Sequence, residues 1–84
     1  MYLHLGQDTV ITLENILGIF DLDSTSQSFL TREFLSAAEK SGWVVNAAED
    51  IPNSFLLCEE EDGVRVYLSQ STSRTLWKRN DQLL

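Results

Sequence analysis

The sequence has few of the residues that build disulfide frameworks or basic surfaces. Its 84 residues include one cysteine, one proline and one histidine, and only 6 Lys and Arg stand against 13 Asp and Glu. Because Cys58 has no second cysteine to pair with, an intrachain disulfide is excluded, and this usage favours a reducing compartment. The formal net charge of -7 argues against nonspecific nucleic-acid binding, since phosphate repels such a chain unless its basic residues cluster.

Long apolar runs are also missing. No segment approaches the ~18 consecutive apolar residues that a membrane-spanning helix needs. The first residues, Met-Tyr-Leu-His-Leu-Gly, contain neither the basic nor the apolar segment of a secretory signal peptide. The sequence therefore predicts a cytoplasmic protein of bacterial type with no membrane contact.

The composition that remains is that of a small globular protein. Hydrophobic residues make up 43% and charged residues 23% of the chain, which excludes a collagen-like chain, a disordered tail and a disulfide scaffold. The length predicts one domain over residues 1–84, with residues 80–84 as a frayed tail. A chain of this size buries only about 60–65% of its unfolded surface, so its core is thin.

Self-association often completes a thin core, and we expect a homo-oligomer larger than a dimer. Large apolar side chains would supply the subunit contacts. The candidates for these contacts are Phe20, Phe29, Trp43 and Trp77.

Periodicity predicts strands and helices in a definite order. Short apolar or alternating runs predict strands at residues 2–5, 9–13, 16–22, 43–47, 55–60 and 64–69. Residues 25–41 are predicted to form the main helix, and a short C-terminal helix runs from Ser71 or Thr72 to about Arg79. The resulting order, β-β-β-α-β-β-β-α, predicts an α+β fold with a mainly antiparallel sheet.

Capping and turn residues set the expected limits of these elements. Ser24 and Gln27 fit a capping box before the main helix, and Gly42 occupies the position of a C′ glycine after it. Asp62-Gly63 predicts a two-residue type I′ turn between the last two strands, because both positions of that turn need positive φ. The helix stripe expected to face the core consists of Leu30, Phe34, Ala37, Ala38 and Ser41.

The segment Asp21-Leu22-Asp23-Ser24-Thr25 follows an apolar run and matches the D-x-D-x-T pattern of haloacid dehalogenase phosphatases. In that chemistry the first Asp attacks phosphorus, the second acts as acid and base, and Mg²⁺ offsets the phosphate charge. The chain is too short for the parallel α/β core of those enzymes, and its only lysines are Lys40 and Lys78. We therefore predict a strand end followed by capping residues and no enzymatic activity, with a phosphatase as the outside alternative.

Two further sets of polar residues have side chains of the kinds that bind metal ions. The run Glu59-Glu60-Glu61-Asp62 offers oxygen ligands, but alternate residues of a strand face opposite sides, so about two at most converge. His4 and Cys58 are the only soft ligands in the chain, and a metal site needs more of them. We predict a solvated hairpin tip, an ordinary strand histidine and a small buried cysteine, with no metal and no cofactor.

The basic residues are unevenly placed. Arg74, Lys78 and Arg79 put half of the positive charge into the predicted C-terminal helix, where Arg74 and Lys78 share a face and Trp77 lies nearby. Two interpretations stay open for this group. It forms a surface that binds phosphate or a partner, or it places cations favourably near a helix C-terminus.

Several stretches, taken in order along the chain, resemble the bacterial extracellular matrix regulatory protein B (RemB) family, a relative of the matrix and biofilm regulator RemA. These stretches read MYLHLG, GIFDLD, TREFL, EDIPNSF and VYLS. The resemblance covers about residues 1–79 and rests on the co-occurrence of the stretches. It implies a regulator in the RemA pathway, where RemA activates transcription, binds DNA and assembles into rings that display basic surface.

The resemblance also exposes a departure. RemA carries an arginine pair for DNA in the loop before its penultimate strand, and this chain has Asp50-Ile51-Pro52-Asn53-Ser54 there, with no basic residue. An anionic loop repels phosphate, so a ring-like assembly carries over more readily than this DNA contact. Arg32 matches a basic helix position in the related protein.

Two binding hypotheses follow for the expected homo-oligomer. In the first it binds DNA, and the candidate residues are Arg74, Lys78, Arg79 and Arg32. In the second it is an interaction module or scaffold that binds a basic protein partner, and the candidates are Glu49, Asp50, Glu59, Glu60 and Glu61. Weak patches repeated around the oligomer would add by avidity in the first case, and charge complementarity would set the choice of partner in the second.

Overall fold

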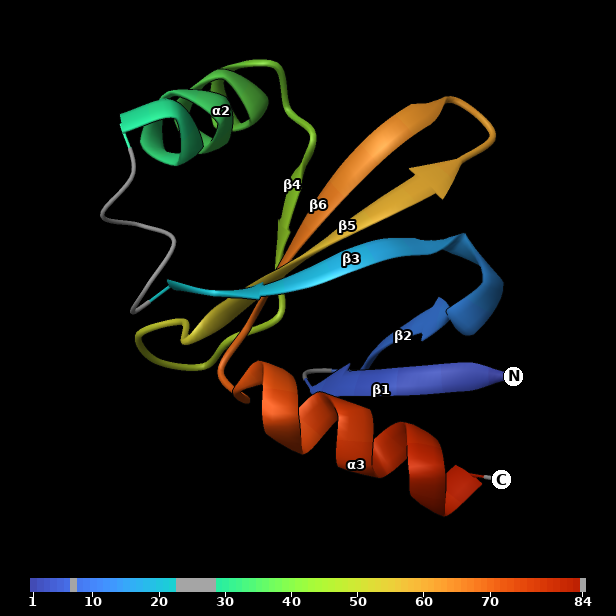
Figure 1. Ribbon diagram of the computed structural model, residues 1–84. Helices are drawn as coiled ribbons and strands as arrows, with labels where there is room; N and C mark the ends of the chain where they lie inside the picture. The colour runs from blue at the N-terminus through green and yellow to red at the C-terminus, as the bar shows by residue number, and fades with distance from the viewer. Residues whose placement is uncertain (7, 23–28, 84) are drawn as a thin grey trace.

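Figure 1 shows the computed structural model, which describes residues 1–6, 8–22 and 29–83. Its elements, in chain order, are β1 (Tyr2–Gly6), β2 (Thr9–Thr12), the 3₁₀ turn η1 (Leu13–Asn15), β3 (Ile16–Asp21), α2 (Phe29–Lys40), β4 (Val44–Asn46), β5 (Ser54–Glu60), β6 (Gly63–Ser69) and α3 (Ser73–Leu83). The predicted order of strands and helices, and with it the α+β fold, is confirmed.

The described strands form one main sheet and one separate hairpin. In the main sheet the order is β3-β5-β6-β4, which places β3 and β4 at the two edges. β5 pairs antiparallel with both β3 and β6, and β4 pairs parallel with β6. β1 and β2 form the antiparallel hairpin. The sheet is therefore mainly antiparallel, and the connection that contains α2 joins its two edge strands, β3 and β4.

The main sheet separates two apolar clusters (Figure 1). α2 covers one face, where Ala38 packs with Phe55 and Val66. β1, β2 and α3 cover the other face, where Leu56 and Tyr67 belong to the second cluster. Because side chains alternate along a strand, the neighbours Phe55 and Leu56 serve opposite layers. The other buried members of the second cluster are Leu3, Leu5, Ile11, Ala47, Cys58 and Leu76.

The main helix ends in the way that its sequence predicts. Gly42 has a φ of 78°, and its N–H donates to the carbonyl of Glu39 at 3.1 Å. The N–H of Trp43 donates to the carbonyl of Ala38 at 2.9 Å. These two bonds form a Schellman motif, so Gly42 is confirmed as the C′ glycine. The predicted helix start at residues 25–28 lies outside the described residues, as does the capping box of Ser24 and Gln27.

The face that α2 buries differs from the predicted one. Ala38 is buried, as predicted, and Leu35, which the predicted stripe left out, packs against the same cluster. The other four members of the stripe are exposed, Leu30 to 74%; they are Leu30, Phe34, Ala37 and Ser41. The predicted stripe is wrong for these residues because α2 covers only part of the sheet, and a helix flank beyond that contact meets solvent.

The hairpin between β5 and β6 is present, but its turn is not the predicted one. Glu60 pairs with Gly63, so Glu61 and Asp62 are the two turn residues. Gly63 has a φ of 124°, whereas Glu61 and Asp62 keep negative φ. The type I′ assignment to Asp62-Gly63 is therefore wrong. The glycine supplies its positive φ at the first residue of β6 instead of inside the turn.

The C-terminal helix begins where expected and runs further. Thr72 precedes α3, and its Oγ1 accepts a hydrogen bond from the N–H of Thr75 at 3.3 Å. This bond makes Thr72 the N-cap residue, one of the two predicted candidates. The helix continues to Leu83, beyond the predicted end at about Arg79, so residues 80–83 extend a helix instead of a tail.

Candidate functional site

The position of α3 is set by one apolar anchor and one carboxylate. Leu76 is completely buried in the cluster between the sheet and the β1–β2 hairpin. At the start of the helix, Asp21 Oδ1 accepts a hydrogen bond from the N–H of Ser73 at 2.8 Å, and Asp21 Oδ2 accepts one from Ser73 Oγ at 2.7 Å. The end of β3 thus holds the first turn of α3 in place.

This arrangement bears on the phosphatase alternative. The hydrogen bonds from the Ser73 hydroxyl and N–H lower the pKa of Asp21 below its usual 3.8, because they favour the charged carboxylate. Both oxygens that a nucleophile would offer are engaged in holding a helix terminus. Asp23, Ser24 and Thr25, the rest of the motif, lie outside the described residues. Asp21 ends β3, as predicted, but the helix terminus that it holds is that of α3 and not that of the main helix that follows it in the sequence.

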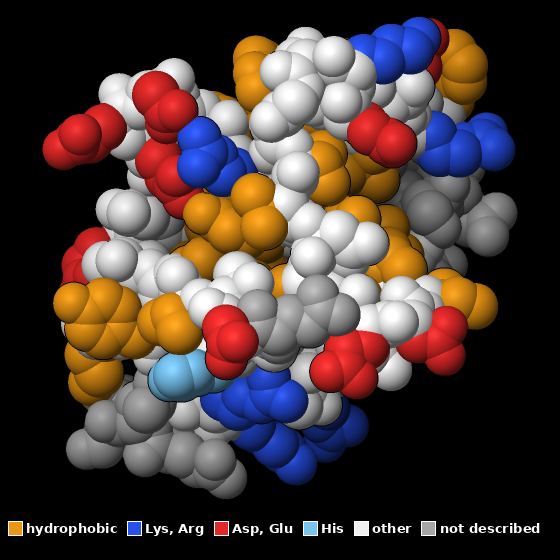
Figure 2. All heavy atoms as spheres, turned by 180° about the vertical axis from the view of Figure 1, so that it is seen from behind, with side chains coloured by type: hydrophobic (Ala, Val, Ile, Leu, Met, Phe, Trp, Pro, Cys, Tyr) orange, Lys and Arg blue, Asp and Glu red, His pale blue; other side chains and the backbone are white. Residues whose placement is uncertain are grey.

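Three side chains form what we call the α3 outer face: Arg74, Trp77 and Lys78. They lie on the side of α3 away from Leu76, and all three are exposed, Trp77 to 51%. Positions four apart are neighbours on a helix, so Arg74 and Lys78 are adjacent, as predicted. Figure 2 shows basic side chains gathered at the lower end of the molecule, where α3 lies.

Arg79 and Arg32 do not join this face. Arg79 is half-buried, and its Nη1 donates to the backbone carbonyl of His4 at 3.0 Å, which ties α3 to β1. Arg32 is exposed on α2, across the main sheet from α3. The structure therefore separates the four candidate DNA contacts into an exposed pair on α3, a structural tether and a residue on the opposite layer.

The acidic candidates are divided as well. Glu49 lies beside the start of β5 and α3, since its N–H donates to Gln70 Oε1 at 3.3 Å. Asp50 follows Glu49 in the same loop, whereas Glu59, Glu60 and Glu61 lie at the far end of the β5–β6 hairpin. β5 has 7 residues, which at about 3.3 Å each separates the two groups by roughly 20 Å. The acidic residues between positions 49 and 62 therefore do not form a single surface.

The hairpin tip holds its own counter-charge. Arg65 forms ion pairs with Glu60 at 3.2 Å and with Asp62 at 2.8 Å. Glu60 also accepts a hydrogen bond from the hydroxyl of Tyr67. Glu60 is thus engaged within the hairpin, and Glu59 and Glu61 are the exposed acids that remain on this tip.

Tyr67 and Cys58 are buried beside Glu60. Burial, reinforced by the bond to Glu60, raises the pKa of Tyr67 to about 12. Burial and the charge of Glu60 raise the pKa of the Cys58 thiol to about 11. A thiol with that pKa is neutral and a poor nucleophile near neutral pH, as the prediction of a small buried cysteine requires. Within the described residues, no group of three or more His, Cys, Asp and Glu is placed to hold a metal.

The four predicted contact aromatics are all exposed but lie apart. Phe20 is on β3, Phe29 begins α2, Trp43 precedes β4 and Trp77 is on α3. Sequence reasoning missed a groove of about 350 Å³ between α2 and the sheet. Its lining residues are Phe20, Leu30, Thr31, Phe34, Phe55 and Leu57. The sequence offers no direct signal for it, because Leu30 and Phe34 have the spacing of ordinary core residues.

The described residues define a small α+β protein whose charged and aromatic candidates lie on outer surfaces of a layered sheet. No described helix is long and apolar enough to cross a membrane. No family model matches the chain. It is similar to Extracellular matrix regulatory protein B of Bacillus subtilis (strain 168), with 34% identity over 79 residues that cover 94% of this chain and 89% of that protein. The chain belongs to the extracellular matrix regulatory protein B family, as its sequence predicted.

Proposed function

We propose that this protein is a non-enzymatic, cytoplasmic regulator of extracellular matrix and biofilm genes that acts as a homo-oligomer and contacts DNA through the α3 outer face. The observation that carries the proposal is the pair of exposed cations, Arg74 and Lys78, on a helix fixed from beneath by Leu76 and Asp21. The relative's name supports the regulatory part, since it is an extracellular matrix regulatory protein.

The net charge sets the form of this contact. One chain of charge -7 that offers two exposed cations on α3 binds DNA weakly. A ring or other oligomer repeats the α3 outer face, and several weak contacts to one duplex then add through their effective concentration. Oligomerisation is therefore what makes DNA binding by an acidic chain feasible.

The acidic loop restricts where DNA approaches. Glu49 is held beside Gln70, next to the start of α3, and Asp50 follows it in the same exposed loop. This is the loop where the resemblance places the arginine pair of RemA. Its negative charge would repel phosphate, so the contact uses the exposed side of α3 and leaves the loop outside the duplex.

The test is binding of a matrix-gene promoter duplex at low salt, measured by fluorescence anisotropy. Lys78→Gln is expected to weaken binding, because it removes one exposed phosphate contact in every subunit. Lys40→Gln is the matched control, since it removes one exposed cation from α2 on the opposite layer and should leave affinity unchanged. Equal affinities for the wild-type protein and Lys78→Gln would contradict the assigned surface.

A second function is favoured by the hairpin tip. Glu59 and Glu61 are exposed there, about 20 Å from the acidic loop by strand length, and they offer a local acidic surface to a basic protein partner. In this alternative the protein is an interaction module or scaffold without DNA binding. Binding of a basic regulator that is lost in Glu59→Gln/Glu61→Gln, with no DNA binding even at low salt, would favour it.

A further inference from the structure

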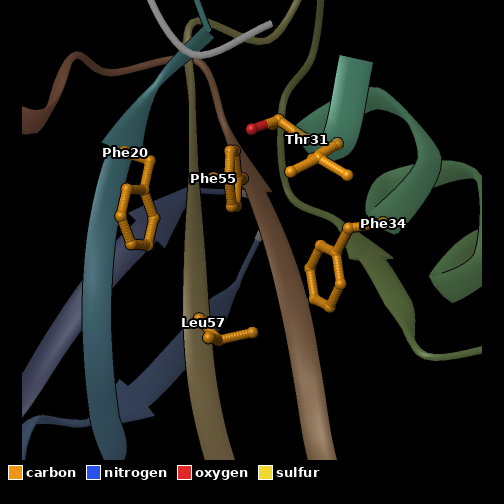
Figure 3. Close-up of a pocket in the computed structure, with 6 residues that line it drawn as sticks. Phe20, Thr31, Phe34, Phe55 and Leu57 are labelled. Atoms are coloured by element: carbon orange, nitrogen blue, oxygen red, sulfur yellow. The ribbon is translucent and has the colours of Figure 1, made fainter. Parts of the chain in front are cut away.

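The groove of about 350 Å³ lies between α2 and the edge strand β3. Ala38 of α2 belongs to one cluster with Val66 on β6 and Phe55 on β5, so the contact of the helix with the sheet reaches as far as β5. Beyond that contact, the side chain of Phe20 on β3 stays exposed. Figure 3 shows Phe20 on β3, Phe55 on β5 and Phe34 on α2 lining it from its two sides and its floor.

The aromatic floor of the groove is held in a fixed arrangement. The rings of Phe20 and Phe55 stack with centroids 5.1 Å apart and an angle of 24° between their planes. The Phe20 ring lies over Gly18 so closely that a Cβ on that glycine would come within 2.8 Å of it. Phe20 nevertheless stays 38% exposed and Phe34 stays 37% exposed. The apolar surface is therefore formed in advance and is not covered by the described part of its own chain.

The groove continues into an open sheet edge. β3 is an edge strand, and among the described strands it pairs only with β5. Its register shifts between Ile16 and Gly18, and Asp21 ends it, two features by which edge strands avoid pairing with another chain. Between them, Gly18 to Phe20 contain no charged residue and no proline. Leu17, also on this strand, is exposed. This uncharged part of the edge adjoins the apolar groove and extends its apolar surface.

The distribution of charge indicates which protein binds in the groove. Two copies of a chain with charge -7 repel each other, so they can meet only where acidic side chains are few or balanced. Of the described residues at this place, the groove lining is uncharged, and the exposed side of α2 carries Arg32 next to Glu33, one charge of each sign. Across a two-fold axis, such a pair can face its own complement. The acidic loop carries no cation, and at the hairpin tip the single cation Arg65 is outnumbered by the four acids from Glu59 to Asp62.

We propose that the groove between α2 and β3, with the uncharged part of β3 from Gly18 to Phe20, is the surface through which this protein binds a second copy of itself. This proposal rests on the proposed homo-oligomer and specifies its contact, and it is independent of whether DNA is the ligand. Because α3 lies on the opposite face of the sheet, this association leaves the α3 outer face open. It also gives Arg32 a role at a subunit contact instead of at DNA.

The chain offers a closely matched pair of variants for the test. Leu30 is 74% exposed at the groove, and Ile51 is 76% exposed in the loop before β5. Leu30→Asp and Ile51→Asp make the same kind of change in charge at side chains that contribute little to the core. We expect Leu30→Asp to reduce the mass measured by light scattering toward that of a single 9.5 kDa chain, and Ile51→Asp to keep the wild-type mass. Circular dichroism of each variant checks that the fold is intact.

Each outcome decides a different point. A folded Leu30→Asp variant that keeps the oligomeric mass of the wild type overturns this surface and leaves the proposed homo-oligomer standing. A wild-type protein that is monomeric at every concentration overturns the surface and the oligomer together, while DNA binding is judged separately by Lys78→Gln. A small apolar molecule found by native mass spectrometry on a monomeric wild-type chain, and absent from Leu30→Asp, overturns the second copy as the occupant.

Discussion

Asp21 at the end of β3 accepts two hydrogen bonds from Ser73 at the start of α3, a residue 52 positions away in the sequence. The bond lengths are 2.8 Å from the Ser73 N–H and 2.7 Å from its hydroxyl. This pair joins the edge of the main sheet to the helix that carries Arg74 and Lys78. The orientation of the proposed DNA surface therefore depends on a residue whose sequence context resembles a phosphatase nucleophile.

Asp21→Ala removes both of these bonds. We expect a loss of about 1–2 kcal/mol in the free energy of unfolding, the range for a lost helix cap. Urea unfolding followed by circular dichroism measures it. Asp50→Ala removes a carboxylate from an exposed loop and serves as the control. Equal unfolding midpoints for these two variants would show that Asp21 does not hold α3.

The same contact predicts a pH dependence. The pKa of Asp21 is lowered from 3.8 in the folded protein, so the charged carboxylate is the form that the fold favours. Its stabilising contribution is present above pH 3.8 and is lost as the pH falls through the lower pKa of the folded state. The difference in unfolding free energy between the wild type and Asp21→Asn should shrink on acidification. A difference in unfolding free energy between the two proteins that stays constant as the pH falls below 3.8 would contradict this linkage.

Leu76 and Trp77 are neighbours on α3 with opposite roles. Leu76 is completely buried, and Leu76→Ala is expected to cost about 2–5 kcal/mol through lost burial and the cavity left behind. Trp77 is 51% exposed, and Trp77→Ala is expected to cost less than about 1 kcal/mol. Thermal and urea unfolding of both variants test whether Leu76→Ala loses more stability than Trp77→Ala. A larger loss in Trp77→Ala would mean that α3 packs against the rest of the protein through another face.

Tyr67 provides a spectroscopic test of the hairpin network. Its pKa is raised from 10.0 to about 12 by burial and by its bond to Glu60, so the folded state favours the neutral phenol. The resulting stabilisation is complete below pH 10 and is lost as the pH rises toward 12. Alkaline titration of tyrosinate absorbance should show a late step that disappears in Tyr67→Phe. If Tyr67→Phe kept the same late rise in absorbance, the rise would belong to another group.

Much of the fold could be predicted from local patterns. Gly42 marks the end of α2 because a C′ glycine adopts positive φ at little cost, and its signal lies within a few residues. The side chains of Val66 and Tyr67 alternate between layers because they are neighbours in a strand. These features depend on short-range stereochemistry, which a single sequence carries.

The predictions that were wrong depend on contacts between distant parts of the chain. Leu30 has the spacing of a core residue but is 74% exposed, because it lies on a flank of α2 beyond the contact of the helix with the sheet. No local pattern encodes how far that contact reaches. Asp21 resembles a nucleophile until its partner Ser73 is known. Arg79 resembles a DNA contact until the carbonyl of His4 is found beside it. In each case the deciding partner is brought close only by the tertiary fold.

The salt dependence of DNA binding tests the central claim most directly. For the wild-type protein, the logarithm of the association constant should fall linearly with the logarithm of salt concentration. In Arg74→Gln/Lys78→Gln the slope should be shallower by about 0.9 for each phosphate contact removed. Binding that is absent at low salt, or a double variant with the wild-type slope, would contradict the assignment of DNA binding to the α3 outer face.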